Sequence, residues 1–148
     1  MPRWMTVKKS FFDLCNDKEL MQTKNGRPCV LLVSLKYKDK RRDFVVPLRS
    51  NISPNVPKET YKNLPPNKNT KKNHHHGVHY TKLFPVSKEY IDTYLISQDA
   101  YMLMIQGILD KCTKEIVTAC QNYLIEYEKG NKDPYTPDID KIIEILDS

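Results

Sequence analysis

The reactive side chains of the basic N-terminal half are arginine, lysine, serine and histidine. They concentrate in two stretches: Lys24 to Ser50, which begins Lys-Asn-Gly-Arg-Pro-Cys and ends Pro-Leu-Arg-Ser, and the histidine-rich run from His74 to His79. Between Phe44 and Val86 the sequence has one acidic residue, Glu59. Because two-metal phosphoryl chemistry requires converging carboxylates, this set favours metal-free cleavage of RNA instead. In that reaction the ribose 2′-OH attacks its own phosphate, and the protein supplies a base, an acid and cationic donors.

Arg27 and Ser50 stand near the two ends of the first stretch. The forked donors of Arg27 could clamp the scissile phosphate, or the side chain could cap a turn or pair with Asp43. The Ser50 hydroxyl could orient the phosphate or the 2′-OH, although a serine after a strand is also an ordinary turn former. We predict both as catalytic residues. The neighbours expected to contact RNA are Lys24, Arg49 and Asn51.

All four histidines of the chain, His74, His75, His76 and His79, fall within six positions. Histidine titrates near neutrality and suits acid–base work. The cluster could be a surface loop with adventitious metal affinity, or a zinc site, although no nearby cysteine or carboxylate completes one. The third interpretation, which we adopt, places His76 and His79 at an RNA site as catalytic residues. His79 is the stronger candidate because it lies in an expected strand.

The charge is distributed unevenly along the chain, whose net charge is +6. Residues 1–86 contain 18 Lys and Arg against 6 Asp and Glu (+12), whereas residues 87–148 contain 6 against 12 (−6). This asymmetry predicts a polyanionic partner, nucleic acid, for the first part, with a solvated basic face as the alternative. Further expected RNA contacts, lysines to phosphates and aromatic rings in the same groove, are Lys8, Lys9, Phe11, Lys71, Lys72, Tyr80 and Lys82.

The expected elements run from strands to helices, without alternation between the two, which is typical of an α+β fold. A length of 148 residues predicts one domain. Expected strands are 4–7, 30–37, 43–48 and 78–86, and Pro47 is expected to end the ladder of the third or to place it at an edge. A short helix follows Ser10, and residues 50–77 form a long loop. Two helices are expected at 99–129, with a bend at Gly107, and at 138–146.

Cysteine usage and hydropathy indicate a cytoplasmic protein. The four cysteines form no CxxC pair, which predicts reduced, buried thiols. No apolar run approaches the roughly 20 residues that span a bilayer, and the first residues lack the apolar stretch of a secretory signal. We therefore expect no membrane partner, no metal and no cofactor.

In this order, the segments resemble the ToxN/AbiQ family of toxins from type III toxin–antitoxin systems, most closely its CptN branch. The resemblance rests on Trp4–Val7 with Phe11-Phe12, on Arg-Pro-Cys-Val-Leu-Leu-Val from Arg27, on Phe44–Ser50, on Gly77–Val86 and on the long helix. It covers nearly the whole chain, although each motif is short and degenerate. It implies an antiparallel sheet or barrel core, an elongated relative of the MazF toxin, wrapped by helices and followed by a long C-terminal helix.

The resemblance also implies an activity and a partner. The chain would be a single endoribonuclease toxin domain, residues 1–148, that cleaves RNA sequence-selectively without metal or cofactor. The products would carry a 2′,3′-cyclic phosphate and a 5′-hydroxyl. The toxin would cut a repeated RNA pseudoknot, its antitoxin, from a precursor and be inhibited by it in a closed protein–RNA ring, with cellular RNA as the substrate.

Carried over residue by residue, the family's basic residue at the start of the central strand falls on Arg27, and its catalytic serine falls on Ser50. Arg49 stands where the family often has threonine, no lysine follows near Asn51, and Phe11 replaces a tyrosine. These departures leave the histidines to supply acid–base function. The alternative to an enzyme is a non-catalytic RNA- or DNA-binding module whose basic half coats phosphates.

Overall fold

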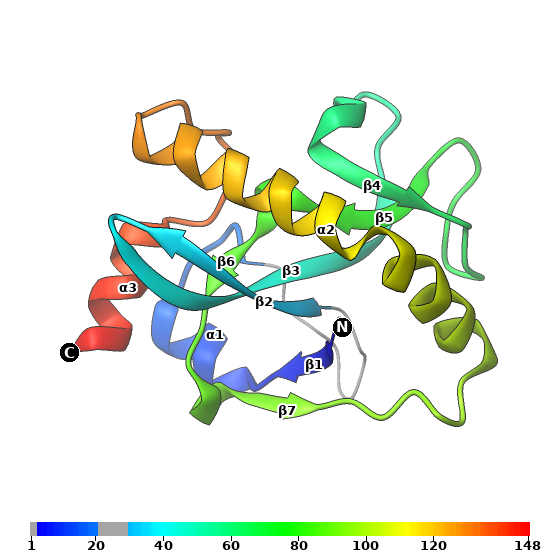
Figure 1. The fold of residues 1–148 in the computed structure, drawn as a ribbon, viewed down its shortest axis with the longest axis horizontal. Coiled ribbons are helices and arrows are strands. Elements are labelled where there is room, and N and C mark those ends of the chain that lie inside the picture. Colours follow the sequence, from blue (N-terminus) through cyan, green and yellow to red (C-terminus); the bar gives the residue numbers. More distant parts are fainter. Residues whose placement is uncertain (1–2, 21–29) are drawn as a thin grey trace.

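The computed structural model describes residues 3–20 and 30–148 (Figure 1). The strands in these ranges are β1 (Arg3–Val7), β2 (Val30–Tyr37), β3 (Lys40–Ile52), β4 (Tyr61–Leu64), β5 (His75–His79), β6 (Phe84–Pro85) and β7 (Ile91–Thr93). They form a seven-stranded antiparallel sheet in the order β4-β5-β3-β2-β1-β7, with β6 paired to β3. The helices are α1 (Lys9–Cys15), α2 (Ala100–Glu128) and α3 (Ile139–Asp147), and three 3-10 turns are η1 (Lys58–Thr60), η2 (Tyr80–Lys82) and η3 (Lys88–Tyr90). The predicted α+β fold, a helix-wrapped antiparallel sheet with a long C-terminal helix, is confirmed.

Strand β3 joins the two halves of the sheet. Its first part pairs with β2 as far as Pro47, opposite Val30, and its second part pairs with β5 from Leu48 onward. Pro47 belongs to the last pair of this ladder among the described residues, at a position where proline has no backbone N–H to donate. The strand itself continues to Ile52, four residues beyond the expected end at Leu48.

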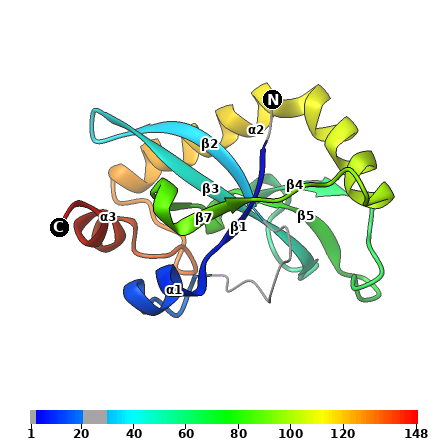
Figure 2. The same ribbon diagram turned by 90° about the horizontal axis from the view of Figure 1, so that it is seen from below.

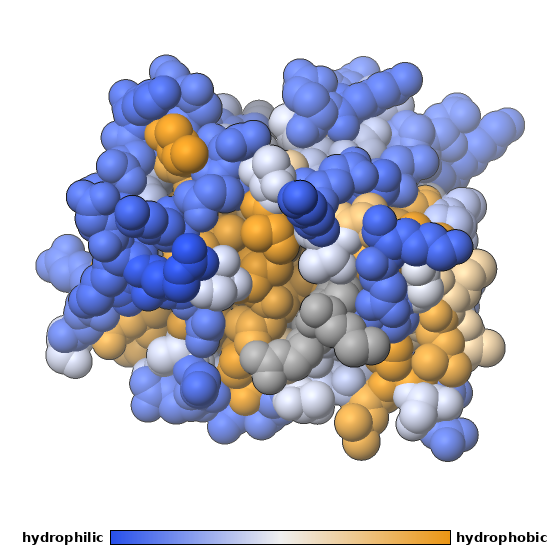
Figure 3. All heavy atoms as spheres, viewed as in Figure 1, coloured by the Kyte–Doolittle hydropathy of each residue, from blue (hydrophilic) through white to orange (hydrophobic). Residues whose placement is uncertain are grey.

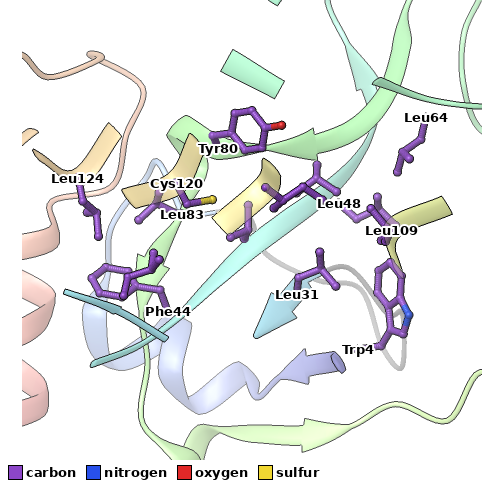
Figure 4. Packing of buried hydrophobic residues seen from close by; sticks show 14 of the residues in the cluster. Trp4, Leu31, Phe44, Leu48, Leu64, Tyr80, Leu83, Leu109, Cys120 and Leu124 are labelled. Atoms are coloured by element: carbon purple, nitrogen blue, oxygen red, sulfur yellow. The ribbon is translucent and has the colours of Figure 1, made fainter. Parts of the chain in front are cut away.

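Side chains alternate between the two faces of the sheet along each strand. Both faces carry buried apolar side chains, and both are covered by helices. The long helix α2 packs on one face, and α1 and α3 contribute to the core on the other (Figure 2). Figure 4 shows the α2 core, in which Leu31, Phe44 and Leu48 of the sheet lie near Leu109, Cys120 and Leu124 of the helix. Residues of the second core include Phe11, Phe12, Val45, Phe84, Val86 and Ile142.

Helix α2 follows the expected range closely. It begins after Asp99, whose carboxylate accepts a hydrogen bond from Met102 N at 3.0 Å, an N-cap of the favoured type. The bend expected at Gly107 lies instead at Cys112, whose backbone is non-helical (φ −128°, ψ 19°). Below α2 the face in Figure 3 exposes apolar side chains. A hollow of about 190 Å³ on the helix–sheet boundary is lined by Leu31, Leu32, Val33, Ser34, Thr113, Ile116 and Val117.

Several expected boundaries are wrong. Residues 50–77 contain η1, β4 and the start of β5 rather than one long loop. The expected strand 78–86 is interrupted by η2, and α1 begins at Lys9 with Lys8 in the N-cap position. Strand β7 was not expected. These are short elements whose pairing partners lie far away in sequence, so local composition gives little sign of them. Among the described helices none is long and apolar enough to cross a membrane.

Candidate functional site

The site forms where the second part of β3 meets β5. Leu48 lies opposite Val78, and Arg49 lies opposite Gly77. Leu48 and Val78 both belong to the α2 core, so alternation turns Arg49 and His79 to the face away from α2. There Arg49 Nη1 lies 3.0 Å from His79 Nδ1.

The electrostatics of the pair fix the tautomer of the histidine. His79 is 5% exposed, and burial, together with the charges of Arg49 and Lys82, lowers its pKa to about 4. The imidazole is therefore neutral at pH 7. Because a guanidinium can only donate, Nδ1 accepts from Arg49 and the histidine proton resides on Nε2. Burial lowers the pKa of Arg49 as well, although arginine remains a cation in proteins.

Among the described residues, Arg49 has no carboxylate partner. None of the ion pairs among the described residues includes it, and residues 1–2 and 21–29 contain no aspartate or glutamate. A buried arginine is normally paired, since an uncompensated charge is costly away from water. The second cation, Lys82, is paired with Glu19 at 3.1 Å. The half-buried guanidinium beside a neutral imidazole is therefore suited to receive an anion.

Ser50 and Asn51 follow Arg49 through a β-bulge, a register shift between Arg49 and Ile52. A bulge re-aims side chains, and here three consecutive residues are partly exposed instead of alternating. The Ser50 hydroxyl accepts from Asn67 Nδ2 at 2.9 Å. The Asn51 side chain donates to Asn69 O at 2.9 Å and accepts from Lys71 N at 2.7 Å. These bonds hold residues 65–74, which we call the 65–74 loop, against the end of β3.

No family model matches the sequence, and no curated protein matches it. Two solved structures match along nearly the whole length. One, described as "A processed non-coding RNA regulates a bacterial antiviral system", superposes with a TM-score of 0.73 over 99% of this chain and 98% of that chain, at 12% identity. The other, on "selective toxin inhibition by a non-coding RNA pseudoknot" in bacterial type III toxin–antitoxin systems, gives a TM-score of 0.55 over 97% and 94%, at 14% identity. This chain has their fold.

Within this fold, three of the predicted catalytic residues lie in described parts of the chain, and two of them belong to the site. His79 contacts Arg49, and Ser50 follows Arg49 directly. His76 lies on the opposite face, 1% exposed, with Nδ1 2.8 Å from Pro65 O and 2.7 Å from the Tyr101 hydroxyl. Burial lowers its pKa. Residues at odd spacing on a strand face opposite sides, so His76 and His79 do not converge. Arg27, the other predicted catalytic residue, lies outside the described residues.

Some of the residues expected to contact RNA lie at the site, and others do not. Arg49, Asn51, Lys71 and Lys72 lie at or beside the site, the two lysines exposed on the 65–74 loop. Phe11 is fully buried in the second core and Tyr80 is buried in the α2 core (Figure 4), so neither ring is available to a base. Lys8 and Lys9 are exposed at the start of α1, where Lys9 pairs with Asp13 at 2.8 Å. Lys24 lies outside the described residues.

Two residues of the site were not expected from the sequence. Tyr61 of β4 lies edge-on to His79, with ring centroids 6.1 Å apart, and Asn67 holds Ser50. Neither stands in a motif or at a telling spacing, so only the strand pairing reveals them. In the part of the chain that the structure describes, no three His, Cys, Asp or Glu side chains gather to hold a metal ion.

The pKa of His79 makes stability depend on pH. An unfolded histidine takes up its proton near pH 6.5, whereas folded His79 does so only near pH 4. Between these values the unfolded chain binds more protons, so acid favours unfolding. We expect His79 alone to lower the unfolding free energy by about 3 kcal/mol between pH 7 and pH 4. Urea unfolding of the wild type and of His79→Gln across this range measures the effect.

The matched control is His74→Gln, a change at the exposed end of the same histidine run, where His74 Nδ1 contacts only Lys72 O at 3.1 Å among its described hydrogen bonds. It should keep the wild-type dependence on pH. An equal dependence in His79→Gln would contradict the assignment.

Proposed function

We propose that this chain is the endoribonuclease toxin of a type III toxin–antitoxin system, a cytoplasmic single-domain enzyme that cuts RNA without a metal ion and is inhibited by its own RNA antitoxin. The observation that carries the proposal is the half-buried Arg49, which pairs with no carboxylate in the part of the chain that the structure describes and is hydrogen-bonded to neutral His79. It lies beside a serine, in the fold of two proteins whose descriptions concern regulation or inhibition by non-coding RNA. Assignment to the CptN branch stays a prediction.

The geometry suits attack of the 2′-OH on the adjacent phosphate. Arg49 would hold a non-bridging oxygen, and the Ser50 hydroxyl would donate to the same phosphate, so that both stabilise the developing dianion. A phosphate at Arg49 brings negative charge that offsets the cations lowering the pKa of His79. When Arg49 turns from Nδ1 to the phosphate, the freed Nδ1 lone pair can take the proton from the 2′-OH, and the imidazolium so formed can return a proton to the departing 5′-oxygen. The products are a 2′,3′-cyclic phosphate and a 5′-hydroxyl.

The exposed lysines extend the anion site along an RNA strand. Lys71 and Lys72 stand on the loop that Asn51 ties to the site, and we propose that they bind flanking phosphates. Lys82 would do so after exchanging Glu19 for RNA, whereas Lys8 and Lys9 would contribute only with a longer strand. We propose that Arg27 also clamps a phosphate. The inhibited assembly would be a closed ring of the protein with a repeated pseudoknot RNA.

Incubation of the purified protein with RNA in the presence of EDTA tests the function. We expect cleavage, with ends that accept phosphate from a kinase at the 5′ side and carry a cyclic phosphate at the 3′ side. A gel shift without cleavage would overturn the proposal in favour of the non-catalytic RNA-binding module, which the basic N-terminal half also suits. Cleavage that requires added Mg²⁺ would overturn the metal-independent mechanism.

A further inference from the structure

We propose that Asn67 is a positioning residue that aims the Ser50 hydroxyl at the RNA phosphate. The inference rests on the proposed function and adds a residue to its machinery. Asn67 lies on the 65–74 loop, which joins β4 to β5 (Figure 1), 17 residues from Ser50 in sequence. Its side chain would not touch the RNA; it acts through the serine.

The orientation of the Asn67 amide is determined by its neighbours. Oδ1 accepts from Asn69 N at 2.8 Å and from Thr70 Oγ1 at 3.1 Å. Thr70 Oγ1 in turn accepts from Asn67 N at 3.1 Å. Because a backbone N–H can only donate, the carbonyl end of the amide must face Asn69, and the NH₂ end faces Ser50 Oγ at 2.9 Å.

This arrangement decides what the serine can do. A hydroxyl has one proton and two lone pairs. Asn67 occupies a lone pair of Ser50 Oγ, so the Ser50 proton is free to point elsewhere and donate. A donor held in place before the reaction stabilises developing negative charge without reorganisation, which is the larger part of such an effect.

The loop that carries Asn67 is fixed on both sides of it. Before Asn67, Pro65 O accepts from the Tyr101 hydroxyl at 2.5 Å and lies 2.8 Å from His76 Nδ1. After it, Asn51 holds Asn69 O and Lys71 N. The buried His76 thus anchors the loop instead of taking part in proton transfer. A residue that positions a catalytic side chain is effective only when its own position is fixed by neighbouring contacts.

The decisive variant is Asn67→Asp. Aspartate is isosteric, and its Oδ1 can keep both loop bonds, but it presents an acceptor to Ser50 and draws the serine proton inward. At pH 7.5 we expect kcat to fall about 10²-fold. Asn67→Ala removes the donor without adding an acceptor, and its kcat should fall about 10-fold, the effect of losing one hydrogen bond. As pH is lowered toward 4, a growing fraction of the introduced carboxyl is protonated and can donate again, so the relative activity of Asn67→Asp should rise while that of Asn67→Ala does not.

Two further variants separate positioning from structure. The Asn69 side chain makes no hydrogen bond among the described residues, and the bonds of Asn69 use its backbone, so Asn69→Ala should retain wild-type kcat and melting temperature. Thr70→Val releases one hold on the Asn67 carbonyl and should lower kcat, whereas Thr70→Ser should restore it. Wild-type kcat in Asn67→Asp would overturn the inference, as would equal pH profiles of the Asp and Ala variants. Absence of cleavage by the wild type would instead overturn the proposed function.

Discussion

Ser50→Ala is expected to abolish the growth inhibition that the protein causes when it is expressed without its antitoxin. In a purified reaction it should lower RNA cleavage by about 10²–10³-fold, the usual effect of removing one donor from a developing oxyanion. The serine is not expected to act as a covalent nucleophile, since the 2′-OH of the RNA itself attacks. The loss should therefore appear in kcat, measured under single-turnover conditions, and not in the affinity for RNA.

The binding of antitoxin RNA to Ser50→Ala should remain close to that of the wild type, because Arg49, Lys71 and Lys72 keep their charges. Ser53→Ala is the matched control: Ser53 lies in the turn after β3, and its hydroxyl accepts from Asn55 N at 3.2 Å. It should stay toxic. A Ser50→Ala protein that still arrests growth would show that the site is assigned to the wrong hydroxyl.

The sequence predicted those elements whose pattern is local and long. Strand 30–37 was expected at the bounds that the structure has, because its apolar residues serve two cores and form a nearly continuous run. Helix α2 repeats buried residues such as Ile105, Leu109, Ile116 and Leu124 at helical spacing. Strands β4 and β7 have four and three residues, and their pairing with distant strands, not their composition, makes them strands.

The sequence pointed to several residues of the candidate site, but it did not show how these residues are arranged in space. Arg49 was expected to contact RNA and His79 to transfer protons, yet their contact depends on the β3–β5 register and on the bulge after Arg49. No local sequence pattern predicts this register or this bulge. The separation of His76 from His79 could have been predicted, since three residues on a strand reverse the face. The role of Asn67 could not, because a loop brings it to Ser50.

Gly77→Ala is expected to damage both stability and activity. A Cβ atom at position 77 would lie 2.3 Å from the carbonyl oxygen of Lys62 and 3.2 Å from the Tyr61 ring. Gly77 lies opposite Asn63 on β4 and Arg49 on β3, so the backbone of β4 would have to move. We expect a loss of about 3 kcal/mol in unfolding free energy, measured by urea denaturation. Because the shift also moves His79 relative to Arg49, cleavage should fall about 10²-fold even under conditions where the variant is folded.

A second glycine of the chain provides the control for this change. Gly107 lies within α2, and a Cβ atom there would meet nothing within 4 Å. Since alanine favours a helix more than glycine does, Gly107→Ala should stabilise the protein by about 0.5–1 kcal/mol and leave cleavage unchanged. The same substitution would thus have opposite signs at the two positions. If Gly77→Ala unfolds at the wild-type urea concentration and cleaves RNA normally, then β4 does not pair with β5 in this register, and the Arg49–His79 contact that depends on it must be abandoned as well.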